Sequence, residues 1–216
     1  MRCGCASILM GCVQVVDLGA GGQIRYGESH CLWGLPMLMS AAASCLLVVD
    51  IQERLLPKMA APQPVVENTA VLLKAARRLD VPVLVSEQYP RGLGATVPDL
   101  EPLLRPGEKV EKLHFSCIGE EAFADRFRAL QRHQAVVAGI EAHVCVLQTV
   151  EDLLASGIET FVVEDATSSR VEKSQAAAMA RLREAGARVV TTEMVVFEWL
   201  AKAGTPVFKD LSALIK

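Results

Sequence analysis

From Ser44 onward the chain alternates between two hydrophobic patterns. Short apolar runs, which are typical of buried strands, lie within residues 45–50, 81–87, 135–140, 159–165 and 188–193, and 109–116 is predicted as a short strand and its exit. Apolar residues recur at helical spacing over 64–80, 120–133, 143–156, 172–186 and a final segment at 194–204. Strands that alternate with helices predict an α/β fold, namely a three-layer, doubly wound sheet of six mainly parallel strands.

Residues 1–36 lack this rhythm. They contain four of the seven cysteines and many glycines, and they show little periodicity. The stretch GCVQVVDLGAGG is compatible with a strand and a turn, but nothing follows it in the same rhythm. A signal peptide fits poorly because charged residues such as Asp17 and Arg25 interrupt it. We interpret 1–36 as a disordered or mis-started extension and 37–216 as one domain.

Composition narrows the expected partners. Hydrophobic residues make up 51% of the 216 residues and aromatic residues only 5%, so the core must be largely aliphatic. The net charge of -3 argues against nucleic acid or an anionic membrane surface as a partner. No apolar run approaches the roughly 20 residues of a membrane span. The expected partners are a small-molecule substrate and, because the stretch 193–208 is apolar, further copies in a homo-oligomer, either a dimer or a tetramer.

The cysteines within 37–216 give little sign of a disulfide framework. Cys45, Cys117 and Cys145 are scattered, without a CxxC pair. This spacing argues against a zinc site and is typical of a reducing compartment, so we expect a cytoplasmic protein. Each of these cysteines has a simple alternative explanation as a small buried hydrophobic residue.

Reactive side chains stand at the ends of three predicted strands. Asp50 ends the first strand, Lys112 lies at the end of the third, and Cys145 follows the fourth where a helix begins. In doubly wound sheets ligands bind beyond the carboxyl ends of the strands, so the three should meet at one edge. Taken singly, Asp50 could cap a turn or helix, Lys112 could be a solvated surface lysine, and Cys145 could be a packed thiol. Packing does not explain why all three stand at the ends of neighbouring strands.

Together these residues provide a nucleophile, a base and an electrostatic partner. The helix N-terminus and Lys112 should lower the pKa of the Cys145 thiol. Asp50 should accept the thiol proton and return it to a leaving group. Backbone N–H groups at the start of the same helix should stabilise a developing oxyanion.

Three segments resemble the signature segments of the isochorismatase-like cysteine hydrolases, namely LLVVDIQERL (46–55), EKLHFSC (111–117) and GIEAHVCVLQT (139–149). The resemblance extends over about 44–216, and two further segments are similar to the branch of isochorismatase-domain-containing proteins. It implies a Rossmann-like, isochorismatase-type hydrolase fold with a triad of Asp50, Lys112 and Cys145. It also implies a cis peptide bond at Ile140–Glu141, with the backbone N–H groups of Glu141 and Cys145 in an oxyanion hole.

The cysteine is similar to that of the amide-cleaving members, such as nicotinamidase, since the enzyme that gave the family its name lacks it and cleaves a vinyl ether. Nicotinamidases also carry an aspartate and histidines after the second strand that hold a metal. Here that region reads Ser86–Glu87–Gln88–Tyr89, without histidine. We therefore expect no metal ion. His143 should face away from the cysteine, because it stands two residues before it on a predicted helix.

The segment 88–107 is long for a loop in a compact domain and should help to select the substrate. Gln88 and Tyr89 at its start, and Phe115 beyond Lys112, are the predicted substrate contacts. An irregular surface loop or a subunit contact is the alternative explanation. Its GLG sequence is no dinucleotide fingerprint, since the full GxGxxG motif is absent.

The leading hypothesis is a cysteine hydrolase that cleaves a small amide or a related C–N bond. Cys145 would attack the carbonyl and form a thioester acyl-enzyme, while Asp50 would protonate the departing amine and then activate water. This chemistry requires no cofactor. The alternative is a non-catalytic binding module or a redox-sensitive interaction module on the same fold. A nucleotide-dependent oxidoreductase is disfavoured because no phosphate-binding glycine motif follows a strand.

Overall fold

The computed structural model describes residues 16–18, 24–26 and 38–215 of the chain. The chain divides into two units, Met1–Leu38 and Met39–Lys216. In the first unit, β1 (Val16–Leu18) and β2 (Ile24–Tyr26) pair in an antiparallel hairpin. The strand-and-turn pattern in this stretch therefore does lead to a second strand, which the hydrophobic pattern did not predict. The rest of the predicted extension over 1–36 lies outside the described residues.

Six parallel strands form the sheet of the second unit. They are β3 (Ser44–Val49), β4 (Val83–Gln88), β5 (Lys109–Lys112), β6 (Gln134–Ile140), β7 (Glu159–Ser168) and β8 (Arg188–Val190). Their order is β5-β4-β3-β6-β7-β8, and every pairing is parallel. This confirms the predicted α/β class. The chain winds outward from β3 to β5 and then outward again from β6 to β8, so the topological switch lies between β3 and β6.

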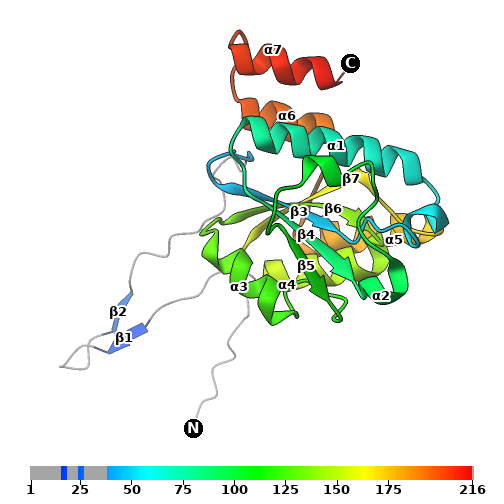
Figure 1. Cartoon of the computed structure of the whole chain (residues 1–216). Helices are drawn as coiled ribbons and strands as arrows, with labels where there is room; N and C mark the ends of the chain where they lie inside the picture. Colours follow the sequence, from blue (N-terminus) through cyan, green and yellow to red (C-terminus); the bar gives the residue numbers. More distant parts are fainter. Residues whose placement is uncertain (1–15, 19–23, 27–37, 216) are drawn as a thin grey trace. The chain divides into compact units, whose positions relative to one another are not determined.

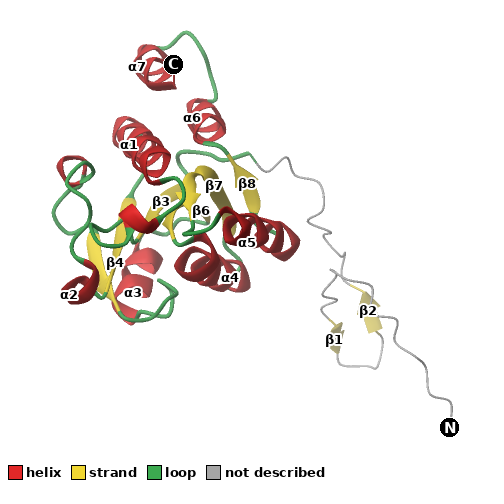
Figure 2. Cartoon of the chain, turned by 90° about the vertical axis from the view of Figure 1, so that its right-hand side faces the viewer, coloured by secondary structure: helices red, strands yellow, loops and turns green. Residues whose placement is uncertain are grey.

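Helices cover both faces of the sheet (Figures 1 and 2). One face carries α1 (Pro62–Arg78) and α6 (Thr192–Leu200), with α7 (Pro206–Ser212) beyond them. The other face carries α3 (Glu121–Ala129), α4 (Leu147–Ala155) and α5 (Glu172–Ala185). A π-helical turn, Ala142–Val146, leads into α4, so the predicted helix over 143–156 is two elements rather than one.

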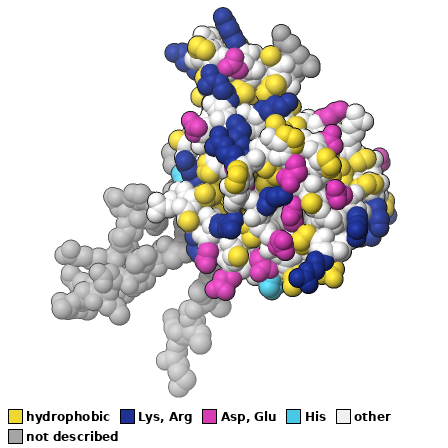
Figure 3. All heavy atoms as spheres, in the orientation of Figure 1, with side chains coloured by type: hydrophobic (Ala, Val, Ile, Leu, Met, Phe, Trp, Pro, Cys, Tyr) yellow, Lys and Arg dark blue, Asp and Glu magenta, His cyan; other side chains and the backbone are white. Residues whose placement is uncertain are grey.

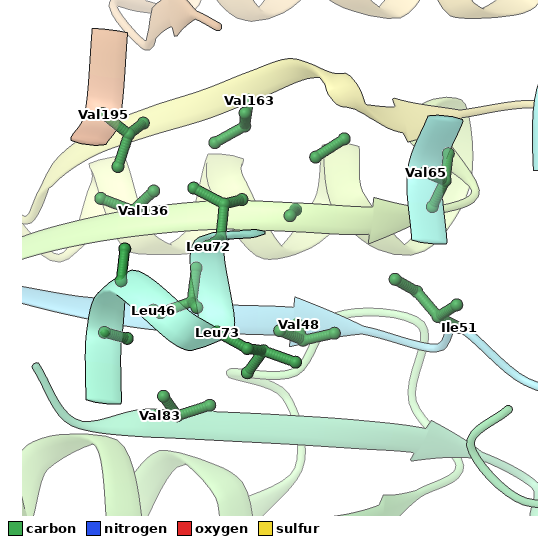
Figure 4. Packing of buried hydrophobic residues seen from close by; sticks show 14 of the residues in the cluster. Leu46, Val48, Ile51, Val65, Leu72, Leu73, Val83, Val136, Val163 and Val195 are labelled. Carbon is green, nitrogen blue, oxygen red and sulfur yellow. The ribbon is translucent and has the colours of Figure 1, made fainter. Parts of the chain in front are cut away.

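The central strands β3, β4 and β6 are buried on both faces, which explains their long apolar runs. Alternate side chains of a strand point to opposite faces, and β3 shows this directly: Leu46 and Val48 belong to one apolar cluster, and Leu47 to the other. Figure 4 shows the first cluster, in which Leu72 and Leu73 of α1 pack over the sheet. Burying each leucine contributes about 1.5–3 kcal/mol, so α1 is held mainly by this layer.

The segment 88–107 is ordered rather than irregular. It contains the short helix α2 (Pro90–Leu93) and a 3-10 turn, Glu101–Leu103. Backbone hydrogen bonds join it to the residues that follow β3: Arg54 N–H donates to the Leu93 carbonyl, and Val97 N–H to the Ile51 carbonyl, both at 3.0 Å. These bonds place the segment beside the carboxyl edge of the sheet. Among the described residues, no helix combines the length and the apolar character needed to cross a membrane.

Candidate active site

Asp50 and Lys112 meet at the carboxyl edge of the sheet. Asp50 follows β3 directly, Lys112 ends β5, and β4 lies between those two strands. Lys112 Nζ donates to Asp50 Oδ2 at 2.8 Å, and both side chains are fully buried. Ser86 in β4 donates from Oγ to the other carboxylate oxygen at 2.7 Å. A buried ion pair is tolerated only when its remaining polar atoms also have partners, and both oxygens of Asp50 meet this condition.

The Lys112 ammonium group is saturated with acceptors. Besides Asp50 it contacts Gln88 Oε1 at 2.6 Å and the carbonyls of His114 and Phe115 at 3.2 and 3.0 Å. An ammonium group carries three protons, so four acceptors leave none for a substrate. Burial by itself would lower the pKa of Lys112, but the Asp50 carboxylate raises it above its ordinary value. Lys112 therefore acts through a fixed positive charge.

Cys145 lies in the π-helical turn that follows β6, the strand next to β3. It is 5% exposed. Burial raises the pKa of the Cys145 thiol strongly, and the charge of Asp50 and a hydrogen bond to its carboxylate add to this, while Lys112 opposes it. The predicted lowering of this pKa is therefore wrong, because desolvation of the thiolate and the adjacent carboxylate outweigh the cation. The raised pKa favours the protonated thiol beside the Asp50 charge.

The turn that carries Cys145 also offers backbone N–H groups. The peptide bond between Ile140 and Glu141 is cis. The Glu141 carbonyl accepts from the N–H groups of Val144 at 3.0 Å and Val146 at 3.2 Å. Hydrogen bonds of a π-helix run from residue i to residue i+5, so Val146 is the first donor of that pattern. Cys145 comes one residue before Val146, so its own N–H group lies in the same turn as its thiol.

The three predicted substrate contacts lie around this edge in different settings. Gln88 is 9% exposed, and its amide bonds to Lys112 through Oε1 and to the Leu113 carbonyl through Nε2, at 2.9 Å. Both of its polar ends are occupied by protein groups, which favours a positioning role over substrate contact. Tyr89 and Phe115 are about half exposed, at 52% and 54%. Tyr89 also borders a hollow of about 290 Å³ that reaches Lys112 and Leu113.

Sequence reasoning missed the residues that complete the cluster. Ser86 holds Asp50, and Gln52 is completely buried, with its amide bonded to the backbone of Gln88. Cys117 is also fully buried, and both Asp50 and Lys112 act on its thiol. The only local signal was a polar residue among apolar neighbours, as at Gln52 two positions after Asp50.

The two histidines near the site have protein partners. His143 Nδ1 is 2.9 Å from Ser169 Oγ, and His114 Nδ1 is 3.2 Å from Glu120 Oε2. Within the described parts of the chain, no group of three His, Cys, Asp or Glu side chains is arranged to hold a metal ion. A metal-free reaction stays a prediction, since no observation here tests it.

The fold, a six-stranded parallel sheet flanked by helices, is the isochorismatase-type α/β fold. The Isochorismatase domain matches residues 44–194, and the chain belongs to this family. This confirms the resemblance drawn from the three sequence segments.

The relatives cover most of the chain. Isochorismatase domain-containing protein 2A of Mus musculus is 39% identical over 176 residues, which are 81% of this chain and 83% of that protein. The secreted isochorismatase effector Isc1 of Phytophthora sojae is 38% identical over 178 residues, or 81% and 85%. A solved structure of the MAR1 ribonuclease from Caenorhabditis elegans is 34% identical and has a TM-score of 0.78, covering 83% of this chain and 92% of that one.

Proposed function

We propose that this chain is a cysteine hydrolase that cleaves a small amide, or a related C–N bond, through a thioester acyl-enzyme. The observation that carries the proposal is a single buried carboxylate, Asp50, which accepts a hydrogen bond from the Lys112 ammonium group and whose charge acts on the Cys145 thiol, raising its pKa. Membership of a hydrolase family supports the reaction class. The triad and the bond cleaved are our inference from the contacts.

In the first half-reaction Asp50 takes the thiol proton while Cys145 Sγ attacks the substrate carbonyl carbon. A thiol with a raised pKa is suited to this step, because the Asp50 charge already acts on it and the thiolate forms only as the new bond forms. The carbonyl oxygen gains the negative charge. The backbone N–H groups of Glu141, just before the turn, and of Cys145, within it, would stabilise that oxyanion.

Asp50, now protonated, gives its proton to the departing amine as the C–N bond breaks. The acyl group stays on Cys145 as a thioester. Asp50 then removes a proton from a water molecule that attacks the thioester, and the released thiolate takes that proton back. The net reaction consumes one water and yields an acid and an amine, and no electrons are transferred. Lys112 remains paired with the Asp50 carboxylate at the start of each cycle.

We infer that the substrate is small and uncharged. The thiol is almost completely buried, which restricts the size of a group that reaches it. The two charges of the site are paired with each other, and the cation has no free proton for an anionic substrate. A substrate charge placed there would therefore be uncompensated, at a high desolvation cost.

The experiment is a screen of small amides and ureides for ammonia release, with matched cysteine variants. Cys145→Ala should abolish turnover and the acyl-enzyme mass adduct. Cys45→Ala is the control, because Cys45 is equally buried but lies at the opposite end of β3 and bonds to the Gln134 carbonyl. Full turnover in Cys145→Ala, or equal loss in both variants, would overturn the proposal.

The alternative is a non-catalytic or redox-sensitive interaction module. The specific observation that favours it is the burial of Cys145, which raises the pKa of its thiol and makes it a poor nucleophile unless Asp50 acts as base. A short RNA belongs in the same screen, because the C. elegans relative is named a ribonuclease. We expect no cleavage of RNA, since the chain has a net charge of -3 and acidic and basic side chains are interspersed on the face shown in Figure 3.

We further propose that the chain forms a cytoplasmic homo-oligomer, a dimer or a tetramer, and that 1–36 is an extension outside the domain. Met194 and Phe197 of α6 are exposed, and the Phe197 ring lies 6.4 Å from that of Phe208, which supports an apolar contact surface. The free cysteines of the described residues suit a reducing compartment. Sedimentation that finds only a 23.3 kDa monomer would contradict the oligomer.

A further inference from the structure

The side chain of Gln88 is held between two parts of the candidate active site. Its Oε1 accepts from Lys112 Nζ at 2.6 Å, the shortest of the four contacts of that ammonium group. Its Nε2 donates to the Leu113 carbonyl at 2.9 Å. The carbonyls of the next two residues, His114 and Phe115, also accept from Lys112. One amide group thus fixes both the ammonium group and the loop that supplies two of its acceptors.

Gln88 is fixed in turn by Gln52, which follows Asp50 by two residues and is completely buried. The Gln88 N–H donates to Gln52 Oε1 at 2.8 Å, and Gln52 Nε2 donates to the Gln88 carbonyl at 3.0 Å. Gln52 Nε2 also donates to the Gly94 carbonyl at 2.7 Å, within the segment 88–107. The two buried amides therefore tie together the end of β4, the residues after β3 and the long segment.

A buried ammonium group needs an acceptor for each proton, because it has lost its hydration. Without Gln88, the three protons of Lys112 would still have three acceptors, namely Asp50 and two carbonyls, but the loop that carries these carbonyls would have lost its bond at Leu113. The position of the cation relative to Asp50 and Cys145 would then no longer be fixed. Since electrostatic support for a thiolate falls with distance, thiol reactivity should depend on this amide.

We propose that Gln88 is a positioning residue, which fixes the Lys112 ammonium group beside Asp50 and Cys145, and that Gln52 holds Gln88 in place. The inference rests on the proposed function, because the cation matters to the thiol only if Cys145 is the nucleophile. It replaces the substrate contact predicted for Gln88 from the sequence. Gln88 should then control the reactivity of the thiol without touching the substrate.

The test is a double-mutant cycle read on the thiol itself. The rate of Cys145 alkylation by iodoacetamide is measured from its peptide by mass spectrometry at about pH 9, near the ordinary thiol pKa. Gln88→Met should slow alkylation about tenfold, which corresponds to a rise of about one unit in the thiol pKa. In Lys112→Met protein, Gln88→Met should have no further effect, because its action passes through Lys112. A wild-type rate in Gln88→Met, or equal slowing in both backgrounds, overturns the proposal.

Gln175→Met is the matched control. Gln175 also donates from Nε2 to two backbone carbonyls, those of Thr167 at 2.9 Å and Glu164 at 3.4 Å, and neither bond is to a triad residue. In the Gln175→Met variant, Cys145 should be alkylated at the wild-type rate. Slowing as large as that in Gln88→Met would mean that any loss of such an amide loosens the fold, and would overturn the specific role of Gln88.

Circular dichroism checks that each variant folds. If Gln88→Met does not fold, Gln88→Glu carries the test, because it keeps the size of the side chain and its acceptor. The added negative charge beside Lys112 should slow alkylation at least about tenfold, and an unchanged rate contradicts the proposal. The cycle needs no substrate, so its failure is distinct from that of the proposed function, which would show as turnover in Cys145→Ala.

Discussion

The apolar layer beneath α1 and the charged cluster at the carboxyl edge are both buried, but different forces hold them. In the layer, side chains such as Leu46 and Leu72 meet by packing, which has no preferred direction (Figure 4). In the cluster, Asp50 and Lys112 are buried because each polar atom has a partner, at distances of 2.6 to 3.2 Å. The layer should tolerate exchanges of similar volume, whereas the cluster should not tolerate the loss of one partner.

The largest effect is expected at Gly139, where β6 passes β3 next to the cluster. Its φ is 129°, and a Cβ there would lie 2.1 Å from the Val49 carbonyl oxygen. Because Asp50 directly follows Val49, a shift of β3 that relieved this clash would also move Asp50. Gly139→Ala should cost more than about 4 kcal/mol or prevent folding, as measured by urea denaturation.

Gly157→Ala provides the contrast for that measurement. Gly157 also has a positive φ, of 76°, but a Cβ at that position would meet nothing within 4 Å. The Gly157→Ala substitution should lower the free energy of unfolding by only about 1–2 kcal/mol, the ordinary cost of a left-handed conformation for a residue other than glycine. Equal losses for the two glycines would show that close strand approach at Gly139 is not the cause.

The second largest effect is expected when one partner of the Asp50–Lys112 ion pair is removed. Asp50→Leu leaves the Lys112 ammonium group buried without its counter-charge and should lower the free energy of unfolding by about 4 kcal/mol. The double variant Asp50→Leu, Lys112→Met removes both charges and should recover most of that loss. Urea denaturation of the three proteins measures both effects. A double variant less stable than Asp50→Leu would mean that the pair itself stabilises the fold.

The apolar layer should respond to volume alone. Leu72→Ala leaves a cavity beneath α1 and should cost about 3 kcal/mol, whereas Leu72→Met keeps the volume and should cost less than about 1.5 kcal/mol. The same denaturation experiment applies. Similar losses in the two variants would show that this layer, like the cluster, depends on specific contacts.

Alkaline pH should weaken the fold through the buried thiols. Burial raises the pKa of Cys45 to about 12 and that of Cys117 to about 11. The unfolded chain loses these protons near pH 8.5, so the stabilisation is complete below that pH and falls as pH rises toward the folded values. The loss should be at most about 1.4 kcal/mol per pH unit for each thiol. Cys45→Val should reduce the slope of the free energy of unfolding against pH by the contribution of one thiol. An unchanged slope in this variant would contradict the prediction.

The smallest effect concerns a polar atom inside the apolar layer. Among the described residues, Thr69 Oγ1 is buried without a hydrogen-bond partner. Thr69→Val should therefore stabilise the protein by about 1 kcal/mol or less, seen as a small rise in Tm. Thr149→Val is the matched control, because Thr149 Oγ1 accepts from the Cys117 N–H at 2.9 Å, and its loss should destabilise by about 1–3 kcal/mol.

Element boundaries show where local pattern stops being informative. β7 continues to Ser168, three residues past its predicted end, because Thr167 and Ser168 pair with Gly139 and Ile140 of β6. Backbone pairing extends the strand there in spite of polar side chains. The π-helical turn before α4 was predicted as ordinary helix, since apolar spacing over five residues does not distinguish the two. α7 was missed because it is short and only Leu211 in it is buried.

The sequence by itself determined the fold class and the three residues of the candidate triad. Local hydrophobic patterns predict strands that are buried on both faces and amphipathic helices. The carboxyl ends of parallel strands lie at one edge of the sheet, so residues at those ends are expected to lie close together. Only the tertiary structure decided the state of those residues. The protonation of Cys145 and the saturation of Lys112 depend on burial and on partners distant in the chain, such as Ser86, 36 positions from Asp50. Desolvation and hydrogen-bond partners are set by the assembled fold, so no local pattern records them.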